Sequence, residues 1–101
     1  ESAAAARRAI DVEPYSPNLW AALAAAELEA GNTARARQDA EKALSILVEY
    51  PLALEIRSQA AEKLGDQTDA AADRIRLIHL ARESTDDDTR RAATALLRPA
   101  E

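Results

Sequence analysis

The sequence predicts an all-α protein, and three features of its composition support this fold class. Of the 101 residues, 48 % are hydrophobic, and 26 of these are alanine, the strongest helix former. The 22 larger apolar residues include no Phe and no Met. Strands favour aromatic and β-branched side chains, so the lack of Phe argues against a β-sheet protein. Only two glycines and four prolines interrupt the chain. We therefore expect one small helical domain whose helices approach closely over alanine faces.

The few prolines and glycines recur at a fixed spacing. A 34-residue interval separates Pro17 from Pro51, and the same interval separates Gly31 from Gly65. Between residues 17–50 and 51–84, four further identical pairs share this spacing: Ala26 and Ala60, Ala36 and Ala70, Asp39 and Asp73, and Glu49 and Glu83. Each proline stands where a helix can begin, and each glycine where one can end. A constant period of this size indicates repeated helical units.

The first two helices are defined by their ends. Residues 2–12 form a helix that Pro14 stops. A second helix begins after Ser16, which caps its N-terminus, and ends before Gly31. The apolar stripe of this second helix contains Leu19, Trp20, Leu23 and Leu28.

The next two helices follow the same pattern. A third helix begins after Asn32 or Thr33 and ends at about Val48, with an apolar face made of Ala36, Ala40, Ala43, Leu44 and Leu47. Pro51 opens a fourth helix, which ends before Gly65. On this helix we expect one apolar face to contain Leu54, Ala61 and Leu64.

Two further helices complete the chain. Asp66 or Thr68 caps a fifth helix, whose apolar face includes Ala70, Leu77, Ile78 and Ala81. Thr85 is expected to cap the last helix, whose first turn holds Asp86–Asp88 at the positive end of the helix dipole. Leu96 and Leu97 close this helix before Pro99. Six helices joined by short loops predict a row of antiparallel hairpins.

The 34-residue unit resembles the tetratricopeptide repeat (TPR). Residues 17–50 match the family pattern at six places: Trp20 is its large apolar residue, Leu23 its leucine, Ala24 its small residue, Gly31 its glycine, and Ala36 and Ala43 its two alanines. Val48 stands where the family has proline. Residues 51–84 are more degenerate: Leu54, Ser58, Gly65 and Ala70 match, whereas Arg57, Leu77 and Arg74 replace the family's leucine, second alanine and aromatic residue. By the same resemblance, residues 1–14 are the second helix of a preceding unit and residues 85–101 a capping or following first helix. The resemblance implies a right-handed superhelical solenoid.

The resemblance also implies a concave binding face, formed by the first helix of each unit. On this chain the face holds Asn18, Ala21, Ala25, Leu28, Glu29, Leu52, Glu55, Gln59, Glu62 and Lys63, with Tyr15 and Tyr50 at the turns. From these we select as partner-binding residues Leu28, Glu29, Tyr50, Glu55, Gln59, Glu62 and Lys63. Three carboxylates face one ammonium there, so we expect an apolar or basic protein segment as the partner. The alternative is that these are ordinary solvated helix residues.

The family's best-known binding mode is not expected in this chain. In that mode a lysine and an asparagine clamp an acidic C-terminal tail. Ala21 and Ala25 occupy those places in the first unit, and Glu55 and Gln59 occupy them in the second. A chaperone-tail partner is therefore disfavoured.

Composition argues against several other functions. With a net charge of −5, the chain lacks the positive electrostatic field that supports nucleic-acid binding. No apolar run approaches the roughly 20 residues that span a bilayer. Without cysteine, thiol catalysis and zinc–thiolate sites are excluded. We expect no catalytic, cofactor or metal site: the single histidine, His79, has mostly charged helical neighbours, and Asp86–Asp88 lack calcium-loop spacing. Trp20, the only tryptophan, is expected to be a core residue.

These observations predict a non-catalytic protein–protein interaction scaffold. Eleven arginines against two lysines, with the alanine excess, resemble the coding bias of a GC-rich bacterium. Families of this kind often serve bacterial envelope or exopolysaccharide secretion assemblies. We interpret the chain as a piece of a longer polypeptide, because it opens inside an alanine run without Met. The alternative is an architectural spacer or self-association module.

Overall fold

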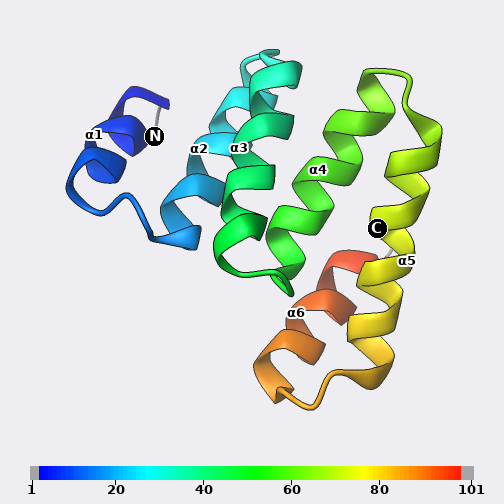
Figure 1. Ribbon diagram of the computed structural model, residues 1–101. Helices are drawn as coiled ribbons and strands as arrows, with labels where there is room; N and C mark the ends of the chain where they lie inside the picture. Colours follow the sequence, from blue (N-terminus) through cyan, green and yellow to red (C-terminus); the bar gives the residue numbers. More distant parts are fainter. Residues whose placement is uncertain (1–2, 99–101) are drawn as a thin grey trace.

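The part of the chain that the structure describes folds into six α-helices joined by loops of three or four residues (Figure 1). The computed structural model describes residues 3–98, and no strand occurs within this range. The all-α prediction is therefore confirmed. The helices are α1 (Ala3–Val12), α2 (Pro17–Glu29), α3 (Thr33–Ile46), α4 (Pro51–Lys63), α5 (Gln67–Glu83) and α6 (Asp87–Leu97).

The helix boundaries repeat with the 34-residue period. α2 and α4 have the same length and begin one period apart, and α3 and α5 also begin one period apart. Gly31 and Gly65 follow α2 and α4 with φ angles of 88° and 84°. A Cβ at either position would meet nothing within 4 Å, so glycine is needed for its backbone conformation. The chain therefore turns in the same way after both helices.

Side-chain caps begin three of the helices. The Ser16 hydroxyl accepts a hydrogen bond from the Leu19 amide at 3.4 Å, and an Asp66 carboxylate oxygen accepts one from the Asp69 amide at 3.2 Å. At α6 the prediction that Thr85 is the cap is wrong. Asp86 is the cap, because its carboxylate accepts from both the amide (2.9 Å) and the hydroxyl (2.6 Å) of Thr89. This pair of bonds lets the helix begin at Asp87.

Consecutive helices pack against each other, and the even-numbered helices also form a layer of their own. α4 contacts both α2 and α6, whereas the backbone of α3 does not approach that of α1 or α5. The described helices thus form two layers, with α2, α4 and α6 packed together and α1, α3 and α5 set further apart. Grooves open between the helices of the second layer.

Alanine supplies much of the core. The main cluster of buried residues crosses α2 to α6 and consists of Ala21, Ala43, Leu44, Ala53, Leu54, Leu77, Leu80 and Ala93. A second cluster joins Ala24, Ala40 and Ile56. Because alanine has a single methyl group, neighbouring helices can approach closely at these positions.

Three apolar residues lie outside the faces predicted for them. Leu64 is the C-cap residue of α4 and is 47 % exposed, because the chain leaves the helix there. Ile78 is 39 % exposed, since α5 turns Leu77 and Leu80 toward the core instead. Leu47 is 44 % exposed because α3 ends at Ile46, two residues before the predicted end at Val48, and Leu47 is its C-cap residue. Within residues 3–98, no helix is long and apolar enough to cross a membrane.

Candidate functional site

Three of the predicted partner-binding residues line one groove. Glu55, Gln59 and Glu62 are four and three residues apart along α4, so they share a helix face. Together with Ser58 and the α5 residues Gln67, Ala70, Ala71 and Arg74 they line an open groove of about 510 Å³. We call this the α4–α5 groove. Lys63 is exposed and is not among its lining residues.

The carboxylate of Glu55 is held in place inside the α4–α5 groove. One of its oxygens accepts a hydrogen bond from Arg74 at 3.1 Å and the other accepts one from the Gln59 amide group at 2.9 Å. The Glu55 side chain is mostly buried, while Glu62 is exposed. The cation that faces these carboxylates is thus Arg74 rather than Lys63. Sequence reasoning noted Arg74 only as a departure from the TPR pattern.

The α4–α5 groove is open because α6 covers only part of this face. α6 starts near the C-terminal end of α5 and packs on α4 and α5 (Figure 1). It has 11 residues against 17 in α5, and since both helices rise equally per residue it ends well short of the opposite end. The groove residues of α4 and α5 lie toward that uncovered end.

The remaining predicted residues have different surroundings. Leu28 is half-buried and packs on the Ala24, Ala40 and Ile56 cluster, while Glu29 beside it is exposed. Tyr50 is half-buried, and its hydroxyl donates to the Asn18 side-chain oxygen at 2.8 Å. Burial raises the pKa of Tyr50. This bond links the start of α4 to the start of α2, so the Tyr50 hydroxyl has an internal partner.

One residue of the transferred concave face is inaccessible. Ala21 is 0 % exposed and belongs to the main core cluster. The expectation that it contributes to a binding surface is wrong, because α2 turns this position toward its neighbours. The accessible part of the face on α2 is therefore smaller than the resemblance implied.

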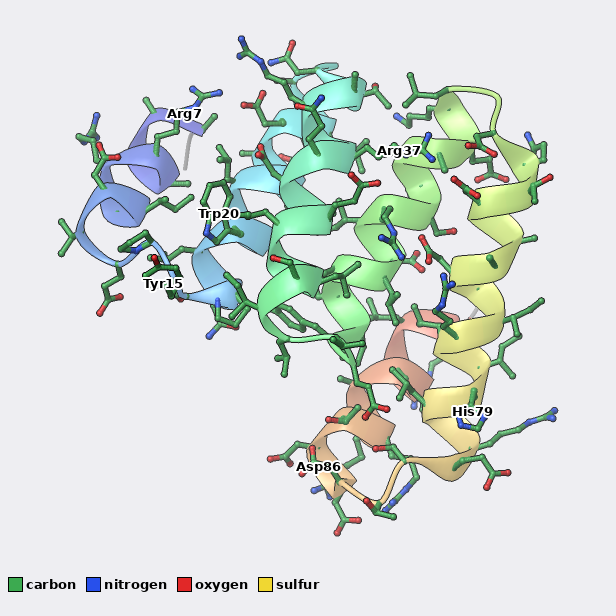
Figure 2. The ribbon with its side chains drawn as sticks, in the orientation of Figure 1. Arg7, Tyr15, Trp20, Arg37, His79 and Asp86 are labelled. Atoms are coloured by element: carbon green, nitrogen blue, oxygen red, sulfur yellow. The ribbon has the colours of Figure 1, made fainter. Side chains whose placement is uncertain are left out.

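Trp20 contacts the core and also lines a surface cleft (Figure 2). Its ring packs against the main core cluster, as expected, but the residue is only half-buried. The indole N–H donates to the Pro14 carbonyl oxygen at 2.7 Å, and the Lys42 ammonium lies 5.7 Å from the ring centroid. One side of Trp20 lines a cleft between α1 and α3.

Buried ion pairs form a group of charged contacts that sequence reasoning missed. Glu27 is 0 % exposed, and its carboxylate is bonded to Arg7 and to the Asn32 amide group. Asp73, 2 % exposed at its side chain, accepts two hydrogen bonds from Arg57 at 2.8 Å each. The hydrogen bonds to Asp73 raise the pKa of Arg57. Arg7 and Arg57 are distant in sequence from the carboxylates they bind, and no local pattern pairs them.

A further charged contact joins α3 to the start of α5. Arg37 forms ion pairs with Asp66 at 3.0 Å and Asp69 at 2.5 Å. The hydrogen bond to Asp66 raises the pKa of Arg37, while the backbone hydrogen bond from Asp69 is the main cause that lowers the pKa of Asp66. The contact connects the two 34-residue units.

His79 lies on the exposed side of α5 (Figure 2). Within residues 3–98, no group of three or more His, Asp or Glu side chains is arranged to hold a metal ion. Asp87 and Asp88 instead pair with Arg90 at 2.6 Å and Arg91 at 3.2 Å on their own helix.

Comparison with known proteins adds no assignment: no protein-family model and no curated protein matches this chain. The fold and the site therefore define only the class of protein: it is an all-α protein built of helical hairpins, with open grooves at its surface.

Proposed function

We propose that this protein is a TPR-type helical solenoid and acts as a non-catalytic scaffold that binds another protein. The 34-residue offset of the helix boundaries supports the repeat interpretation. The layer of α2, α4 and α6 corresponds to the first helices that line the binding face in the resembled family. The binding surface would hold Leu28, Glu29, Glu55, Gln59, Glu62 and Lys63, with Tyr50 at its edge.

The α4–α5 groove carries this proposal. Its lining includes Glu55, whose carboxylate Arg74 and Gln59 hold in one position by hydrogen bonds. A partner that binds there loses its own freedom but requires little reordering of the groove. Glu62 at its exposed rim attracts positive charge, so the preferred partner is a basic or apolar segment.

Families of this kind often serve bacterial envelope or exopolysaccharide secretion assemblies, and we propose that setting for this protein.

Self-association is the second candidate function, and one observation favours it. A mostly apolar groove of about 350 Å³ opens between the α3–α4 loop and α5, lined by Val48, Leu54, Ile75, His79 and Leu80 together with the charged residues Glu49 and Arg76. A concentration-dependent mass in sedimentation would support that candidate.

A pair of amphipathic helical peptides, identical except that one carries Lys and the other Glu, tests the binding proposal. We expect fluorescence anisotropy to show binding of the Lys peptide only, weakening with added salt. The double variant Glu55→Lys/Glu62→Lys should lower the affinity by about tenfold or more, since each charge change alters a direct contact.

The matched control is Glu13→Lys/Glu83→Lys, which makes the same change in net charge at exposed positions outside the groove. It should bind nearly as the wild type does. Equal losses in both double variants would show a general charge effect and contradict a site in the α4–α5 groove. Circular dichroism of each variant verifies that the helices remain folded.

A further inference from the structure

The largest of the grooves between the helices of the second layer lies between α1 and α3. This α1–α3 cleft has a volume of about 600 Å³. Ile10, Trp20 and Leu23 provide its apolar lining, and polar or charged residues from both helices provide the rest: Arg7, Asp11, Arg35, Gln38 and Asp39. Figure 2 shows Trp20 between α1 and α3, and Arg7 on α1.

A groove between α3 and α5 occupies the equivalent place one period later. Asp39 and Leu23 of the α1–α3 cleft correspond, one period on, to Asp73 and Arg57, which line this second groove. There the guanidinium of Arg57 bonds both carboxylate oxygens of Asp73, and Arg76 adds a third bond at 2.6 Å. The second groove thus contains its own cations.

The α1–α3 cleft lacks both of those cations. Leu23 stands where Arg57 would be, and Lys42, which corresponds to Arg76, places its ammonium over the Trp20 ring. Arg7 is bonded to the buried Glu27. Asp39 is half-buried, yet its side chain makes no hydrogen bond or ion pair with any residue that the structure describes.

The electrostatic surroundings of Asp39 agree with this geometry. Burial is the main cause that raises the pKa of Asp39, and the charge of Glu27 raises it further, against smaller opposing effects of Arg7 and Arg35. Arg7 and Arg35 both line the cleft, but neither forms an ion pair with Asp39, so an ionised carboxylate in this place has no bonded cation. A cation brought from outside would relieve that deficit.

We propose that the α1–α3 cleft binds an arginine side chain of a partner protein, whose guanidinium pairs with Asp39 as Arg57 pairs with Asp73. Arginine fits better than lysine, because its planar fork bonds both oxygens of a carboxylate. Its aliphatic stem would lie on Trp20, Leu23 and Ile10. This site is separate from the α4–α5 groove, which is built from other helices.

A blocked tripeptide, acetyl-Leu-Arg-Leu-amide, is a suitable probe, followed by NMR titration of the protein. Trp20 lines the cleft and is the only tryptophan, so its indole N–H gives one resolved signal. We expect this signal and the Asp39 amide to shift with a dissociation constant in about the millimolar range. The same peptide with citrulline, a neutral arginine analogue, or with glutamate should produce little shift.

Two substitutions make the test specific to Asp39. Asp39→Asn should weaken binding of the arginine peptide by about tenfold. Asp88→Asn, the same chemical change at an exposed position on α6, should leave binding unchanged. Unchanged affinity in Asp39→Asn, comparable shifts with citrulline or glutamate, or no shift with arginine would each overturn the proposal.

Leu23→Arg provides an independent test, because it supplies in the chain the guanidinium that Arg57 provides in the second groove. If circular dichroism shows native helicity, this variant should no longer bind the peptide. Persistent binding would place the peptide elsewhere. Glu55→Lys/Glu62→Lys should bind the arginine peptide normally, which separates this inference from the proposed α4–α5 site.

Discussion

At the residue scale, two aspartates at the same place in the 34-residue period have opposite surroundings. Asp73 is buried and bonded to Arg57 and Arg76, whereas Asp39 is half-buried with no such partner among the described residues. A buried carboxylate is tolerated only where hydrogen bonds and opposite charges replace its water. Asp73 is therefore a structural residue, whereas the carboxylate of Asp39 remains available for the proposed ligand.

This contrast predicts opposite effects of the same substitution. Asp73→Asn should lower the free energy of unfolding by about 1–3 kcal/mol, because Arg57 loses its charged partner. Asp39→Asn should leave stability unchanged or slightly higher at neutral pH. Urea denaturation of both variants measures the difference, and a comparable loss in Asp39→Asn would mean that Asp39 has a structural role.

The pH dependence of the Asp39→Asn effect follows from the raised pKa of Asp39. An aspartate in the unfolded chain has a pKa of about 3.9. Between that value and the higher folded pKa, the folded protein binds more protons, so Asp39 reduces stability as pH rises through this window. Glu27, Arg7, Arg35 and the cleft residue Asp11 are the charged groups that face it.

The stability gain of Asp39→Asn over the wild type should therefore be near zero at pH 3 and largest at pH 7. Comparing the two proteins at each pH cancels the opposite contribution of Asp66 and Asp86, whose lowered pKa values reduce stability as pH falls. A gain that grows toward low pH would contradict the stated sign.

At the scale of single helices, small buried residues set how closely the helices pack. Ala36 is 0 % exposed on α3, at a place where the TPR pattern also has alanine. A larger side chain at such an interface needs space that an alanine contact does not contain, so it is expected to push the helices apart.

Ala36→Leu should therefore lower the free energy of unfolding by about 1–3 kcal/mol through overpacking. Ala34→Leu is the matched control, because Ala34 is exposed on the same helix and the substitution has a similar effect on helix propensity. Thermal melts compare the two variants. No loss in Ala36→Leu would contradict the proposed repeat register.

At the scale of the whole molecule, each helix contacts only its near neighbours along the chain. α6 packs on α4 and α5 and on no other described helix. In such an arrangement, stability is close to a sum of local and neighbouring contributions. A change at one end should therefore be felt mainly by the helices next to it.

A chain that ends at Ser84, and so lacks α6, tests this behaviour. Its loss uncovers Leu77 and Leu80, which belong to the core cluster that Ala93 of α6 completes. Hydrogen exchange should accelerate in α4 and α5, while protection in α1 to α3 changes little. Uniform loss of protection across all the helices would contradict a repeat-like architecture.

The sequence by itself determined the fold class and most helix ends, because these depend on local backbone physics. Pro17 and Pro51 begin helices, and Gly31 and Gly65 end them at positive φ, as expected. The cap of α6 was assigned to Thr85 instead of Asp86, since several neighbouring residues there can act as caps. The helix faces lined by alanine could also be predicted, because the alanines recur at the spacing of helix turns.

Only the tertiary structure decided which charges meet and which surfaces remain open. Arg74 lies against Glu55 in the α4–α5 groove, Arg57 forms an ion pair with Asp73, and no described residue forms an ion pair or hydrogen bond with the Asp39 side chain. These relations depend on residues distant in sequence and on how far apart the helices of each layer stand. Local sequence patterns carry no information on such distances, because helix packing brings the side chains together only in the folded chain.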